Sequence, residues 1–107
     1  MLIYNVTLKV HPGIIAEWKT WMSQIHIPEM MATGLFAQCS FCRLLDQDES
    51  DGTTFVAQYY CNNRDNYERY LQEHAPEMRQ KGFDKFGDKV LGFRTLMEII
   101  AEPGKKN

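Results

Sequence analysis

Residues 24–30 read Q-I-H-I-P-E-M, and residues 72–78 read Q-E-H-A-P-E-M. Each stretch is followed by a glycine at the same distance, Gly34 and Gly82. Between positions 24 and 34, six of the eleven residues are identical to those 48 positions later. The repeat indicates a chain of two similar halves, and it marks either a duplicated site or a duplicated way of ending a helix.

The segments around the repeat predict alternating strands and helices. Apolar residues recur with the period of a strand in residues 3–10, 35–45, 54–61 and 89–100, and with the period of a helix from Ile14 to Ile25 and from Tyr67 to Met78. Asp51-Gly52 predicts a hairpin turn, and Asn62 or Asn63 predicts a helix cap. The order strand, helix, strand, strand, helix, strand predicts an α+β, ferredoxin-like fold, with a four-stranded antiparallel sheet and two kinked helices on one face. We expect one domain over residues 1–101 and a flexible tail over 102–107.

Composition excludes several classes of partner. The net charge of -2 and the absence of a basic stripe argue against nucleic acid. No apolar run has the length of a membrane span, and the N-terminus lacks the pattern of a signal peptide, so we predict a cytoplasmic protein. Cys39 and Cys42 lie three apart on a predicted strand, so their thiols point to opposite faces and plain packing is favoured over a metal or redox site. We predict no cofactor.

One face of the predicted sheet is too apolar for solvent. We expect the helices to cover Tyr4, Val6, Leu8, Phe93, Met97 and Ile99. The apolar residues of the open face are then Ile3, Phe36, Leu44, Val56, Tyr60, Leu96 and Ile100, beside the polar Asn5, Thr7, Gln38, Gln58, Arg94 and Glu98. A second copy of the chain is the simplest cover for such a face, which predicts a homodimer.

Several stretches resemble a small bacterial domain family of unknown function, within the dimeric α/β-barrel proteins. They include I-Y-N-V-T (3–7), H-I-P-E-M-M-A-T-G (26–34), Y-E-R-Y (67–70) and F-R-T-L-M-E (93–98). The resemblance implies a dimer whose sheets close into a barrel, and it implies no activity. Broader relatives include cofactor-independent oxygenases, isomerases, haem-degrading enzymes and binding proteins. The haem-degrading type resembles this chain in Asn5 and His74, but its tryptophan near the second helix has no counterpart here.

The repeated motif has a structural reading that leaves the histidines unexplained. Proline cannot donate a hydrogen bond to the carbonyl four residues back, and it moves the preceding residue away from helical angles. Each motif should therefore kink or end its helix near Ile27 or Ala75 and restart a short second segment, which the glycine should end. Glu29 and Glu77 would lie in a first turn, where an anion is favoured. The break requires no histidine.

Two functions stay open. The first is a homodimeric barrel that binds a small apolar or aromatic molecule, with oxygenase-type or isomerase-type acid–base chemistry that needs no cofactor. In this reading His26 and His74 are the catalytic candidates, because imidazole titrates near neutral pH, and the ligand-binding candidates are Asn5, Trp18, Tyr59, Tyr67 and Arg94. The alternative is a non-catalytic structural or interaction dimer in which the motif only breaks the helices.

Overall fold

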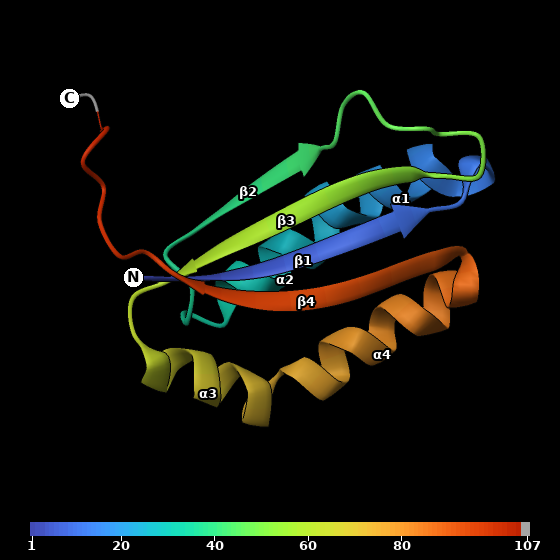
Figure 1. Cartoon of the computed structure of the whole chain (residues 1–107). Coiled ribbons are helices and arrows are strands. Elements are labelled where there is room, and N and C mark those ends of the chain that lie inside the picture. The colour runs from blue at the N-terminus through green and yellow to red at the C-terminus, as the bar shows by residue number, and fades with distance from the viewer. Residues whose placement is uncertain (106–107) are drawn as a thin grey trace.

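Strands and helices alternate along the chain in the predicted order, as the computed structural model of residues 1–105 shows (Figure 1). The elements are β1 (Leu2–Val10), η1 (Pro12–Ile14), α1 (Ile15–Trp21), the π-helical segment η2 (Met22–His26), α2 (Ile27–Ala32), β2 (Gln38–Arg43), β3 (Thr53–Cys61), α3 (Arg64–Glu73), α4 (Ala75–Phe86), η3 (Gly87–Lys89) and β4 (Val90–Glu98). Strand β2 is shorter than the predicted segment 35–45. Asn63 caps α3 by accepting a hydrogen bond from the Asn66 amide, as predicted.

The four strands form one antiparallel sheet in the order β2-β3-β1-β4 (Figure 1). Directly paired residues share a face, so Tyr4 of β1 stands beside Tyr59 of β3 and Leu96 of β4 on the side of the helices. Alternate residues of β1 and β3 are buried there, which is the pattern of strands covered on one side. The ferredoxin-like prediction is confirmed.

Aromatic side chains make up much of the core between the sheet and the helices. Trp18 of α1 packs on Phe41 and Phe55, with ring centroids 5.6 and 4.9 Å away. Tyr4 packs on Tyr59 at 6.1 Å and on Tyr70 at 5.5 Å. These contacts pack α1 and α3 against the strands of the sheet.

The predicted faces of β4 are wrong. Its register pairs Val6 with Arg94 and Tyr4 with Leu96, so Arg94, Leu96 and Glu98 lie on the helix side. Phe93 and Met97 lie on the open face instead. Apolar residues occur at both parities of this strand, so their alternation could not distinguish the two faces, and a shift of one position exchanges them.

Phe36 is a second correction, because it precedes β2 and turns inward. It is buried and stacks on Tyr4 at 6.2 Å, whereas the prediction placed it on the open face. Phe36 lies outside the ladder, where strand alternation does not fix the direction of a side chain. Leu44, Ile99 and Ile100 follow the ends of β2 and β4, and the Leu44 and Ile99 amides still donate to the carbonyls of Thr54 and Met1.

Two broader features bear on function. None of the helices in residues 1–105 has the length and apolar character of a membrane span. Of the tail predicted over 102–107, residues 106 and 107 lie outside the described part of the chain. The described part of the tail, beyond Glu98, leaves the sheet without joining another element (Figure 1).

Candidate functional site

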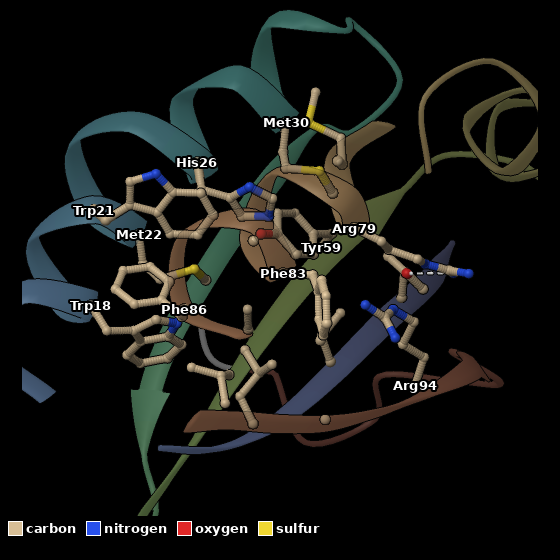
Figure 2. A pocket seen from close by; sticks show the side chains of 18 of the residues that line it. Trp18, Trp21, Met22, His26, Met30, Tyr59, Arg79, Phe83, Phe86 and Arg94 are labelled. Carbon is tan, nitrogen blue, oxygen red and sulfur yellow. Dashed lines mark hydrogen bonds between the residues drawn. The ribbon is translucent and has the colours of Figure 1, made fainter. Parts of the chain in front are cut away.

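A cavity of about 320 Å³ lies between the helices and the covered face of the sheet. Its walls come from three groups of elements: β1, β3 and β4 of the sheet, α1, η2 and α2 on one side, and α3 and α4 on the other. Figure 2 shows Trp18, Trp21, Met22 and Phe86 at one end and Arg79 and Arg94 at the other. Gly92 and Arg94 line it yet are exposed, so the cavity opens between α4 and the edge strand β4. This size is at the lower end for small-molecule sites.

His26 is the last residue of η2, and its side chain lines this cavity (Figure 2). Its ring stacks on Trp21, with centroids 4.8 Å apart and an interplanar angle of 18°. Its Nδ1 atom is buried and has no hydrogen-bond partner among the described residues. Burial lowers the pKa of His26 from 6.5 to about 4, Glu29 opposes this shift, and Lys81 and Arg94 add to it. The imidazole is therefore neutral near pH 7 and keeps an unused polar atom.

Pro28 explains why His26 sits on a π-helical segment. Proline has no N–H for the Gln24 carbonyl, and the helix accommodates this by widening by one residue, with the Ile27 N–H bonded to the Met22 carbonyl. Ile27 keeps helical angles of -62° and -44°, so the predicted departure from helical angles at this residue is wrong. The helix passes through the motif without interruption, and the widened turn positions His26.

The second copy of the motif does break its helix, one residue earlier than predicted. His74 has φ -129° and separates α3 from α4, while Ala75 is the first residue of α4. Gly34, with φ +76°, follows the end of α2 as predicted, but Gly82 lies inside α4 and that helix ends at Gly87. At Gly82 an added Cβ would stand 3.7 Å from the Trp21 ring, an ordinary van der Waals distance, so α4 packs against the Trp21 side chain at this position.

The two motif glutamates meet at one cation. Glu29 and Glu77 lie in the first turns of α2 and α4, as predicted. Lys81 Nζ stands 2.9 Å from Glu29 Oε2 and 3.5 Å from Glu77 Oε1. The repeat thus connects α2 to α4 close to His26. Both ion pairs are exposed, so they stabilise the protein only modestly.

Polar groups other than His26 gather at the opposite end of the cavity. Arg79 of α4 donates a hydrogen bond of 3.2 Å to the Tyr4 hydroxyl. Burial raises the pKa of both Tyr59 and Tyr70 well above its usual value, so both phenols stay neutral at physiological pH. The site therefore combines neutral hydroxyls, a neutral imidazole and two guanidinium cations.

The structure brings four of the seven predicted site residues to the cavity: His26, Trp18, Tyr59 and Arg94. Asn5 lies on the other face of the sheet and hydrogen-bonds Gln58 and Thr7. Tyr67 packs on Tyr4 at 5.6 Å outside the cavity wall. His74 stacks on Tyr70 and stands 3.9 Å from Glu73, also away from the cavity.

Arg79 is the main site residue that the sequence analysis missed. It lies four residues after Ala75 and three before Gly82, and so beside the stripe of Ala75, Met78, Gly82 and Phe86 that faces the core. Continuing the helical period of this stripe past Met78 would have indicated it.

The two thiols of C-S-F-C diverge as predicted. Cys39 pairs with Tyr59 on the helix side of the sheet, and Cys42 pairs with Val56 on the open side. Burial raises the pKa of Cys39 to about 11, so this thiol is protonated and unreactive at neutral pH. The geometry agrees with plain packing.

Solved structures share this fold at low sequence identity. An ethyl tert-butyl ether d (ethd) family protein from Bacillus halodurans has a TM-score of 0.66 and 16% identity, over 94% of this chain and 100% of that one. A dimeric ferredoxin-like protein from an uncultured marine organism has a TM-score of 0.63 and 13% identity, over 94% and 96%. SnoaB, a cofactor-independent oxygenase from Streptomyces nogalater, has a TM-score of 0.63 and 13% identity, over 97% and 98%. These likenesses concern the fold alone.

Sequence comparison gives the family of the chain and no activity. None of the curated proteins matches it. One family model covers residues 1–100, almost the whole fold with its cavity. The chain belongs to the family described as a domain of unknown function, DUF4286.

Proposed function

We propose that this protein binds a small, largely apolar or aromatic molecule in the cavity between sheet and helices. The observation that carries the proposal is the buried, unpartnered Nδ1 of His26 in a cavity walled by aromatic side chains. Buried polar atoms in native proteins are nearly always hydrogen-bonded, so an orphan in a cavity wall favours a ligand that completes it. Aromatic walls with a few polar groups suit flat small molecules.

The reaction class that fits this site is proton transfer without a cofactor. A neutral imidazole with a free ring nitrogen can accept a proton from a bound carbon or oxygen acid. Arg94 would then stabilise the negative charge that remains on the ligand. Such a step begins isomerisation, and oxygenation with dioxygen as the oxidant is a second candidate because this chain shares its fold with SnoaB, a cofactor-independent oxygenase.

The binding proposal is tested by ¹H–¹⁵N NMR spectra of the labelled protein with a library of small aromatic and quinone-like compounds. At least one compound should shift the signals of the His26 ring and the Trp18 indole, while the His74 ring, which lies outside the cavity, should stay in place. His26→Gln should retain binding and lose any conversion of the bound compound. The proposal fails if no compound moves the cavity signals or if His74 responds in place of His26.

We also propose that the protein is a homodimer whose open sheet faces meet. Leu91, Phe93 and Met97 of β4 are 64%, 62% and 39% exposed, and Ile3 and Val56 continue their apolar surface across β1 and β3. A second copy would cover this surface through a two-fold interface. The dimeric ferredoxin-like neighbour supports the assembly.

Substitution Phe93→Ala should weaken this dimer by about 2 kcal/mol, or about 30-fold in Kd, because aromatic side chains that become buried in an interface often contribute a large share of its energy. Sedimentation equilibrium at micromolar concentration measures the change. The matched control is Leu45→Ala, which removes a 71% exposed side chain away from the sheet and should leave the dimer intact. A wild-type protein that sediments as a monomer would remove this account of the open face.

The alternative function, a non-catalytic structural dimer, is favoured by two observations. Lys81 joins both motif glutamates, and the second motif breaks a helix, so part of the repeat is structural. This reading assigns no role to the unpartnered Nδ1 of His26. A protein that dimerises but binds no compound would support it.

A further inference from the structure

The cationic groups of the cavity lie at one end only. At the inner end, Trp18, Met22 and Phe86 present apolar surface, whereas Arg79 and Arg94 present guanidinium groups at the other (Figure 2). Burial raises the pKa of Tyr70, and Arg79 and Arg94 both oppose that shift, so both cations lie within electrostatic range of one hydroxyl. The two arginines therefore act on the same region of the cavity although they come from α4 and β4.

Within residues 1–105, no carboxylate neutralises these two cations. Among the described residues, neither an Asp nor a Glu lines the cavity, and neither guanidinium forms an ion pair. Arg79 donates one hydrogen bond to the Tyr4 hydroxyl, and its remaining N–H donors are available to a ligand. Two unpaired arginines beside an apolar cavity are an unusual arrangement for a binding site of uncharged molecules, because like charges repel and gain nothing from such a ligand.

Resting on the proposed function, we propose that the ligand of this cavity is a small planar aromatic carboxylate. Its ring would lie against Trp18, Met22 and Phe86, and its carboxylate would bind between Arg79 and Arg94. Guanidinium groups match a carboxylate with paired donors, and one anion between two cations relieves their repulsion. Because the apolar and cationic ends of the cavity are separate, the ligand can bind in one orientation. In this orientation it lies beside His26, which also lines the cavity.

The charge of the ligand also links the arginines to His26. Arg94 and Lys81 disfavour the protonated imidazole, while Glu29 favours it. A bound carboxylate would neutralise the effect of Arg94 and add a negative charge of its own, so the pKa of His26 should rise on binding. The arginines thereby set both which molecule enters and how readily His26 takes up a proton in its presence.

The test compares 2-naphthoate with 2-naphthamide, which has the same ring system and no charge, by isothermal titration calorimetry on the full chain. Naphthoate should bind roughly tenfold more tightly or better, since charge-assisted hydrogen bonds are stronger than neutral ones. Arg94→Gln and Arg79→Gln should each remove most of this preference. Arg64→Gln is the matched control: it removes an exposed arginine of α3 that pairs with Glu68 outside the cavity, and the preference should remain.

The outcomes separate this inference from the proposed function. Equal affinity for the acid and the amide would overturn the charge preference and leave ligand binding in the cavity intact. Absence of binding by both compounds, and by the wider aromatic library, would overturn both proposals. NMR titration gives an independent readout, because naphthoate but not naphthamide should raise the pKa of the His26 ring. If a variant fails to fold, the comparison of the two compounds on the wild-type protein still decides the question.

Discussion

Lowering the pH from 7 to 4 should cost the folded protein about 3 kcal/mol through His26 alone. The pKa of this imidazole is 6.5 in the unfolded chain and about 4 in the folded protein, where burial disfavours its charged form. Between these values the unfolded chain binds more protons than the folded one, so acid favours unfolding. The contribution is complete above pH 6.5 and is lost as the pH falls to about 4.

The measurement is urea unfolding of the wild type and of His26→Gln at both pH values. The variant should lose about 3 kcal/mol less than the wild type on acidification, because glutamine does not titrate. The control is His74→Gln, the same change in the other copy of the motif, which leaves His26 in place and should keep the acid-dependent loss. Equal acid sensitivity of wild type and His26→Gln would show that the imidazole is not held neutral by burial.

Trp18→Ala should destabilise the protein by about 3–5 kcal/mol, the largest effect expected for any single side chain of the site. Trp18 is 2% exposed and packs on Phe41 and Phe55 of the sheet. Truncation removes the transfer free energy of the indole and enlarges the cavity that it already lines. A domain of this size is stable by about 5–15 kcal/mol, so the variant should be only marginally folded.

Chemical denaturation monitored by circular dichroism measures this loss. Trp18→Phe keeps a ring against Phe55 and should lose less than half as much. Trp21→Ala is the informative comparison, because Trp21 is only partly buried and its main contacts are His26 and Phe86. It should cost less stability than Trp18→Ala and should move the pKa of His26 back toward 6.5, since removal of the stacked ring admits water. If Trp18→Ala cost under about 1 kcal/mol, the indole would not be part of the core.

The order of elements and the sheet topology followed from local information. Period-two and helical apolar patterns and the cap at Asn63 each depend on neighbouring residues, so they can be read from the chain. Asp51-Gly52 correctly indicated that β2 and β3 form a hairpin, although residues 44–52 connect them in place of a two-residue turn. The wrong faces of β4 have the opposite origin. Its register is set by hydrogen bonds to β1, far away in sequence, and the strand itself is apolar on both sides.

The candidate site shows the same division. The sequence alone determined that Gln24–Met30 and Gln72–Met78 are copies of one motif, with a histidine, a proline and a glutamate at matching positions. Only the tertiary structure decided that the two copies differ. A π-helical turn accommodates Pro28 without ending the helix and places His26 at the cavity, whereas Pro76 follows a helix break that leaves His74 outside it. A missing backbone donor can be accommodated by widening a helix or by ending it, and the outcome depends on packing against elements distant in sequence, here the contacts of Trp21 with Phe86 and Gly82 of α4.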